Sequence, residues 1–141
     1  MKTRVFLFSI LSVLLVACSS GIVQETVESY ADGSAKAVHF YKEEGRKRTL
    51  IKEILYYPNH QKYMEGEYKD GKREGKWTSW NQNGNKWSEG NFKNGLDDGL
   101  RIIYHENGKK FIEGNYKAGE KTGIWRFYDE QGVFVKEENF K

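Results

Sequence analysis

The feature that most constrains the fold of this chain is an internal repeat with a period of 24 residues. Three successive segments open with the same Glu-Gly pair, at residues 65–66, 89–90 and 113–114. Glycines and aromatic residues then recur at fixed positions: Gly66, Gly90 and Gly114; Tyr68, Phe92 and Tyr116; Gly71, Gly95 and Gly119; Gly75, Gly99 and Gly123; Trp80, Tyr104 and Tyr128; Gly84, Gly108 and Gly132. Such a period predicts a stack of small units, each of which packs mainly on its neighbours.

Each unit contains two turn signals, which define two short strands. Asn-Gly and Asp-Gly pairs favour tight hairpin turns because glycine adopts positive φ at little cost. These pairs stand at residues 70–71, 83–84, 94–95 and 107–108. The strands expected between them span residues 86–93, 100–104, 109–117 and 124–128. The sequence therefore predicts an all-β fold, an elongated antiparallel meander of repeated β-hairpins that forms a single-layer, twisted sheet.

The alternation of side chains along a strand predicts which aromatic residues share a face. The first glycine of each repeat lies two positions before an aromatic residue, so a ring can lie over bare backbone on that face. Trp87 and Phe92 are five positions apart, so without a bulge they point to opposite faces. The rings expected to pack between repeats are Tyr68, Phe92, Tyr116, Trp80, Tyr104 and Tyr128. The candidate binding surface is the stripe formed by Tyr63, Trp87 and Phe111, and the alternative is that Trp87 and Phe111 also belong to the packed core.

These repeat columns resemble a known family. The pattern Glu-Gly-x-aromatic-Lys-x-Gly-x-x-x-Gly-x-Trp occurs at residues 65–77 and 113–125 and is similar to the MORN repeat, in particular to its bacterial variant. The middle copy departs from the pattern at Arg101, where the other two copies have Trp77 and Trp125. The resemblance implies an elongated array of hairpins used for binding and scaffolding. Some bacterial members of the family are named as antitoxins or immunity proteins.

The resemblance also divides the chain. It is clear over residues 56–141 and weak over residues 22–55. We assign a MORN-like repeat domain to residues 26–141. Its parts are the clear repeats 65–88, 89–112 and 113–136, a partial repeat at 137–141, and degenerate units within 26–64.

The N-terminal segment predicts export and a lipid anchor. Residues 1–17 read as a signal peptide, because two basic residues precede an apolar run that is too short to span a membrane. The sequence Leu-Val-Ala-Cys, which ends at Cys18, resembles the bacterial lipobox and implies that this single cysteine is acylated. We assign residues 18–25 to the lipidated cysteine and its tether. The alternative is an incidental cysteine beside an ordinary cleavage site. By the same resemblance, Ser19 implies the cell envelope, and the outer membrane in a host with two membranes.

Charge and motifs exclude several classes of function. Without the two cations of the signal peptide, 21 Lys and Arg stand against 20 Asp and Glu, so the chain lacks the positive field of a nucleic-acid-binding protein. The repeated glutamates lie on equivalent strands, about 9.6 Å apart, and we interpret them as solvated or lysine-paired edge charges. Asp97 and Asp98, in an expected hairpin turn, offer too few ligands for Ca²⁺. We find no catalytic, metal-binding or cofactor motif, and therefore predict no enzyme, no metal and no cofactor.

The remaining interpretation is a membrane-anchored, non-catalytic binding or scaffolding module. Its expected partners are the membrane, through the lipid anchor, and either a protein, for example a toxin, or an envelope glycan. An immunity or antitoxin protein and a lipoprotein that binds glycan or peptidoglycan are the two alternatives.

Overall fold

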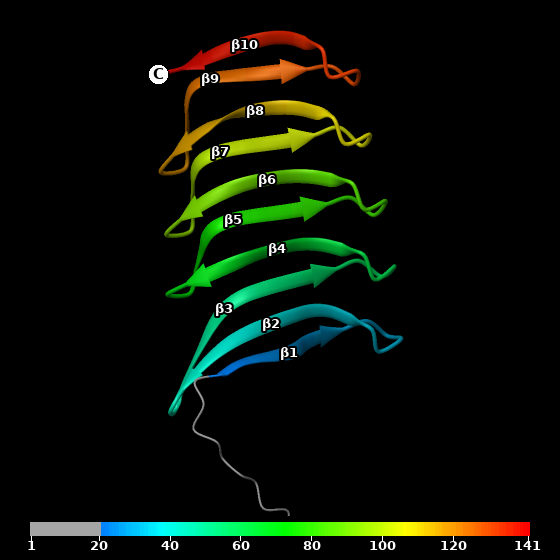
Figure 1. The fold of residues 1–141 in the computed structure, drawn as a ribbon, viewed down its shortest axis with the longest axis vertical. Coiled ribbons are helices and arrows are strands. Elements are labelled where there is room, and N and C mark those ends of the chain that lie inside the picture. The colour runs from blue at the N-terminus through cyan, green and yellow to red at the C-terminus, as the bar shows by residue number, and fades with distance from the viewer. Residues whose placement is uncertain (1–20) are drawn as a thin grey trace, which may run out of the picture.

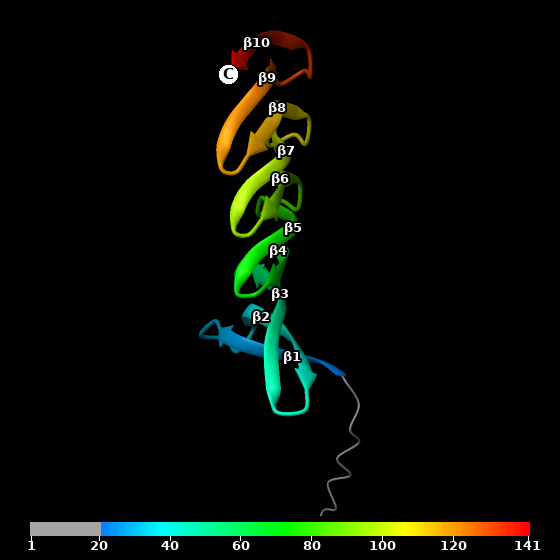
Figure 2. The ribbon, with the colours of Figure 1, turned by 90° about the vertical axis from the view of Figure 1, so that its left-hand side faces the viewer.

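The computed structural model describes residues 21–141, which form ten antiparallel strands in one sheet (Figure 1). The strands are β1 (Gly21–Ser29), β2 (Ala35–Glu44), β3 (Lys47–Tyr56), β4 (Lys62–Lys69), β5 (Lys72–Trp80), β6 (Lys86–Lys93), β7 (Leu96–Tyr104), β8 (Lys110–Lys117), β9 (Glu120–Tyr128) and β10 (Phe134–Phe140). They lie side by side in chain order. Figure 2 shows the hairpins stacked in a column that is one layer thick. The predicted all-β meander is confirmed.

The N-terminal part of the sheet differs from expectation in one respect. β1 begins at Gly21, so residues 21–25, which we assigned to the tether, belong to a strand. The degenerate units continue the same ladder, since β1 pairs with β2, β2 with β3 and β3 with β4. The signal peptide and Cys18 lie outside the described residues. Within residues 21–141, no helix is long and apolar enough to cross a membrane.

The tight turns have the geometry that their sequences predict. Asp70 and Gly71 both have positive φ, 51° and 74°, as do Asn94 and Gly95, 52° and 87°. Two consecutive residues of positive φ suit the right-handed twist of the flanking strands. In the third repeat Ala118 replaces the Asp or Asn and is held at a φ of 49°.

Two strands begin four residues earlier than expected, because one repeat glycine lies inside a strand. β7 starts at Leu96 and β9 at Glu120 rather than at residues 100 and 124. Gly99, with φ of 108°, sits at an irregularity where Phe92 pairs with Asp97 but Gly90 pairs with Arg101. Such a bulge tolerates extra residues on one strand and favours glycine.

A second irregularity changes the predicted faces of the sheet. Ser79 pairs with Ser88 whereas Trp80 pairs with Lys86, which leaves Trp87 as the extra residue of a bulge. A bulge interrupts the alternation of side chains. The prediction that Trp87 points away from Phe92 is therefore wrong: both side chains line one groove. The same shift occurs beside Tyr63 and beside Phe111.

Hydrogen bonds between turns tie each repeat to the next. On one edge of the column, the Gly95 amide donates to the Arg73 carbonyl at 2.9 Å and the Gly119 amide to the Asp97 carbonyl at 2.8 Å. On the other edge, Asn side chains reach the next turn. Their contacts are Asn59 to Gln82, Asn85 to Glu106 and Asn107 to Glu130, all to backbone carbonyls. The glycine contacts recur with the period, and Asn85 makes the contact that Asn59 and Asn107 make in their repeats, so one whole unit is removable.

We predict that deleting residues 89–112, one exact period, leaves a folded β-protein, because the two new neighbours have the same turn contacts as the old ones. Deleting only residues 89–100 removes one strand of a pair and should abolish cooperative unfolding. Circular dichroism with thermal melting of the purified full-length protein compares the two. Equal disruption by both deletions would contradict the modular packing.

Candidate ligand-binding groove

Stacked rings provide the packing on one face of the sheet. Trp77 and Trp125 are the most deeply buried rings among residues 21–141, with 4% and 2% of their surface exposed. Trp77 lies edge-on between Tyr68 and Phe92, at 5.3 Å and 6.1 Å between ring centroids. Trp125 lies in the same way next to Tyr116, at 5.0 Å. Edge-to-face pairs of this kind stabilise beyond the area that they bury.

Each buried indole covers a glycine. A Cβ atom placed on Gly66 would stand 2.1 Å from Trp77, and one on Gly114 would stand 2.2 Å from Trp125. The indole nitrogen of Trp77 also donates to the Glu67 carbonyl at 3.1 Å. The first glycine of the repeat is therefore needed because a ring from the next strand packs directly on its backbone.

The middle repeat keeps this stack but has an arginine in place of the tryptophan. The Arg101 guanidinium takes the indole position, over the rings of Phe92 at 5.4 Å and Tyr116 at 6.0 Å. It also forms an ion pair with Asp97. Burial lowers the pKa of Arg101, but an arginine stays charged at any physiological pH. Cation–π contact on two sides replaces the ring-to-ring contacts of the other repeats.

The residue four positions before Arg101 also differs from its counterparts in the flanking repeats, because its charge is reversed. In the flanking repeats that position carries a cation above the indole: Arg73 lies 4.1 Å from the Trp77 ring, and Lys121 lies 4.5 Å from the Trp125 ring. In the middle repeat the cation is Arg101 itself, and the earlier position is Asp97. The column thus keeps its alternation of cations and rings.

Two small polar residues interrupt an apolar row across the sheet beside Arg101. Flanking repeats place the pairs Leu55 with Met64 and Ile103 with Ile112 there. The middle position holds Ser79 and Ser88, which are buried and whose hydroxyls lie 2.7 Å apart. Two hydroxymethyl groups occupy much less volume than the aliphatic pairs that they replace, so a hollow forms above them.

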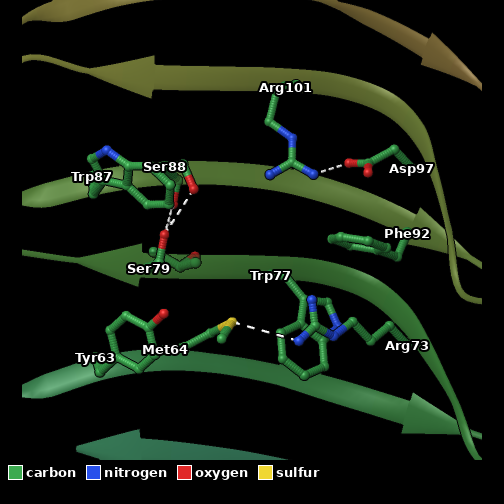
Figure 3. Close-up of a pocket in the computed structure, with 11 residues that line it drawn as sticks. Tyr63, Met64, Arg73, Trp77, Ser79, Trp87, Ser88, Phe92, Asp97 and Arg101 are labelled. Carbon is green, nitrogen blue, oxygen red and sulfur yellow. Dashed lines mark hydrogen bonds and ion pairs between the residues drawn. The ribbon is translucent and has the colours of Figure 1, made fainter. Parts of the chain in front are cut away.

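The hollow is a groove of about 360 Å³ that crosses β4 to β7 (Figure 3). Ser79 and Ser88 lie at its centre, and the side chains around them are those of Tyr63, Met64, Arg73, Trp77, Trp87, Phe92, Asp97 and Arg101. Its volume lies in the range that holds small ligands. The groove contains both rings and polar groups, which is the usual composition of a ligand site.

The three rings of the predicted stripe, Tyr63, Trp87 and Phe111, differ in their neighbours. Trp87 is the one with no aromatic residue six positions before it. Tyr63 packs on Tyr57 at 5.0 Å and Phe111 on His105 at 4.7 Å between ring centroids. Before Trp87 the equivalent position is Asn81, so no ring from that position supports the indole, which is 51% exposed. Among the described residues, the buried Asn81 amide nitrogen has no hydrogen-bond partner. The structure thus places Tyr63 and Trp87 at the groove and leaves Phe111 outside it.

The opposite face is a network of paired charges. Glu65 accepts from Lys52 at 2.8 Å and from Lys62 at 2.5 Å, which is the lysine-paired one of the two expected arrangements. Glu89 makes ion pairs with Lys76 and Lys86 and accepts a hydrogen bond from the Tyr104 hydroxyl. Burial alone would raise the pKa of Glu89, but these hydrogen bonds outweigh it and lower the pKa to about 2. Trp80 and Tyr104, expected to pack between repeats, lie beside Glu65 and Glu89. Tyr128, expected to do the same, donates to Glu113 at 2.5 Å.

The aspartates beside Gly99 serve the structure. They lie in β7 rather than in a hairpin turn, which corrects the sequence interpretation. Asp97 pairs with Arg101, and Asp98 accepts a hydrogen bond from the Ala118 amide at 3.2 Å. Within residues 21–141, no group of three or more His, Cys, Asp or Glu side chains is arranged to hold a metal ion.

Sequence reasoning found the rings of this site but not its polar groups. Ser79 and Ser88 carry no motif, and their signal is only that they replace large apolar residues in the repeat alignment. Arg73 and Asp97 become meaningful only when the strands are paired, because they act on the ring four residues ahead.

Comparison with known proteins agrees with this geometry. The model of the MORN repeat variant matches residues 73–94, 97–118 and 121–141. The three matches begin 24 residues apart, at the same position of the structural repeat. No curated protein and no solved structure gives a significant match to the chain.

We predict that Gly66→Ala destabilises the protein by roughly 1–3 kcal/mol, because the new methyl group would stand 2.1 Å from a ring that is only 4% exposed. Gly90→Ala is the matched control. Its Cβ would meet the Arg101 side chain at 2.7 Å, and that flexible chain turns aside at a smaller cost. Urea unfolding of both variants gives the difference in free energy. Equal losses would show that the indole is not what requires the glycine.

Proposed function

We propose that this protein is a membrane-anchored, non-catalytic binding or scaffolding module. The three MORN-variant repeats favour a repeat-based binding or scaffold role. The observation that carries the proposal is the uncovered groove on a single-layer sheet, since a ten-stranded sheet without a second layer leaves its side chains open to a partner.

The charged groups of the groove favour binding over catalysis. Arg101 and Asp97 are paired with each other, and Arg73 lies over the Trp77 ring. A general acid or base needs a titratable group that is free to exchange a proton with a substrate. The groove instead offers fixed rings and hydrogen-bonding groups, which position a ligand without reacting with it.

The anchor is proposed from the sequence. Cys18 stands three positions before Gly21, where β1 begins, so an acylated Cys18 would hold the sheet within about 10 Å of the membrane surface. The groove lies on β4 to β7, several strands from that end. This arrangement leaves the groove free to meet a component of the cell envelope.

We predict that Cys18→Ser abolishes labelling of the protein by a fatty-acid analogue and releases it from the membrane fraction. Ser19→Ala is the control, because it keeps the cysteine that carries the lipid. Metabolic labelling in the native host, followed by fractionation, measures both properties. Equal labelling of the wild type and Cys18→Ser would remove the anchor from the proposal.

We predict that the full-length protein, immobilised from mild detergent, retains an envelope component, and that Trp87→Ala weakens this capture at least tenfold. The half-exposed indole is the largest exposed ring of the groove. Leu100→Ala is the matched control, because it removes an exposed apolar side chain that borders a hollow beside Lys76 and Glu89 on the opposite face. Failure of the wild type to retain anything beyond a blank resin would contradict the binding role.

A further inference from the structure

We propose that the groove above Ser79 and Ser88 binds a neutral saccharide, with one sugar ring stacked on Trp87. The inference rests on the binding role proposed above and names the chemical class of the ligand.

Three departures from the repeat line the groove, and a fourth, Asn81, stands at the position whose ring supports Tyr63 or Phe111 in the flanking repeats. The residues at the equivalent positions are Leu55, Ile103 and Phe127 for Ser79; Tyr57, His105 and Asp129 for Asn81; Met64, Ile112 and Lys136 for Ser88; and Glu53, Trp77 and Trp125 for Arg101. Ser79, Asn81 and Ser88 lie in the repeat 65–88, and Arg101 lies in the repeat 89–112. Each takes the place of a ring or an aliphatic side chain found in the repeat that follows its own. Lost burial weakens a sheet that buries few apolar side chains. A set of costly changes that together open one groove indicates a ligand site.

The indole offers the apolar part of a sugar site. Trp87 is 51% exposed and stands on the same side of the sheet as the two serines, as Figure 3 shows. A flat ring with a polar edge suits a partner that is apolar on one face and wet at its rim. A pyranose has this form, since its C–H bonds gather on a face and its hydroxyls point outward.

The polar groups match hydroxyls in particular. The hydroxyls of Ser79 and Ser88 lie 2.7 Å apart, and the Ser79 hydroxyl also donates to the Ser88 carbonyl at 3.4 Å. These bonds leave acceptor positions on both hydroxyl oxygens for a ligand. Guanidinium N–H groups add donors, and the Asp97 carboxylate adds an acceptor. Sugar hydroxyls both donate and accept, and therefore use such a mixed set fully.

The charge balance disfavours an anionic ligand. Arg101 is neutralised by Asp97, and Arg73 is the remaining cation of the groove, held over the Trp77 ring. Phosphate or a polyanion is normally bound by several unpaired cations or by a bidentate arginine. A volume of about 360 Å³ is at the lower end for small-ligand pockets, so the groove holds a short stretch of a longer chain.

The test measures whether the groove retains sugar. Envelope extract is digested with proteinase K and passed over immobilised full-length protein, and the sugar in the eluate is measured after acid hydrolysis. We expect the wild type to retain saccharide from the digested extract. The double variant Ser79→Ile, Ser88→Ile, which restores the residues of the following repeat, should fold at least as stably and retain at least tenfold less sugar. Leu100→Ala should retain as much as the wild type.

Two results would overturn the inference. Capture that proteinase K abolishes, with no sugar above the level of the double variant, would identify a protein partner and leave the binding role standing. Equal retention of sugar by the wild type and the double variant would place any saccharide outside the groove. Loss of all capture from undigested extract as well would overturn the binding role itself.

Discussion

The contact between an indole and a glycine is the interaction on which the rest of this structure depends. A single-layer sheet has no second layer to cover its side chains, so burial must come from within the sheet. Trp77 lying over Gly66, and Trp125 over Gly114, achieves this by placing a large ring directly on backbone. The aromatic residue two positions after each glycine then packs edge-to-face against the indole. Each unit therefore becomes stable only through its neighbours, as in other repeat proteins.

The bulges determine which residues can share that contact. Were every strand regular, Trp87 and Phe92 would point to opposite faces, and the groove would lose one wall. The extra residue at Trp87 brings the indole to the face of Ser88, and the irregularity near Gly99 carries Arg101 opposite Gly90. The function proposed for this face thus depends on two irregularities that keep the period of 24 residues.

The sequence predicts those parts of the structure that depend on local patterns. The period, the turn residues and the glycine columns predict the meander and the packed rings, because turns and alternation are local properties. The face of Trp87 could not be predicted, since a bulge is a property of two paired strands and leaves little mark on one of them. The pair of serines could not be predicted for the same reason. Ser79 and Ser88 become a pair only when β5 lies beside β6.

A repeat protein gains a specific site by departing from its own repeat without breaking the stack. The middle unit does this through compensation: Arg101 replaces an indole, and Asp97 replaces the cation that would otherwise repel it. The guanidinium stays between Phe92 and Tyr116, so the column remains continuous while the volume beside it opens. The serines alone would have made a hollow, and the arginine alone would have left an unpaired buried charge. Because the changes support one another, the groove is better explained as one site than as four separate losses.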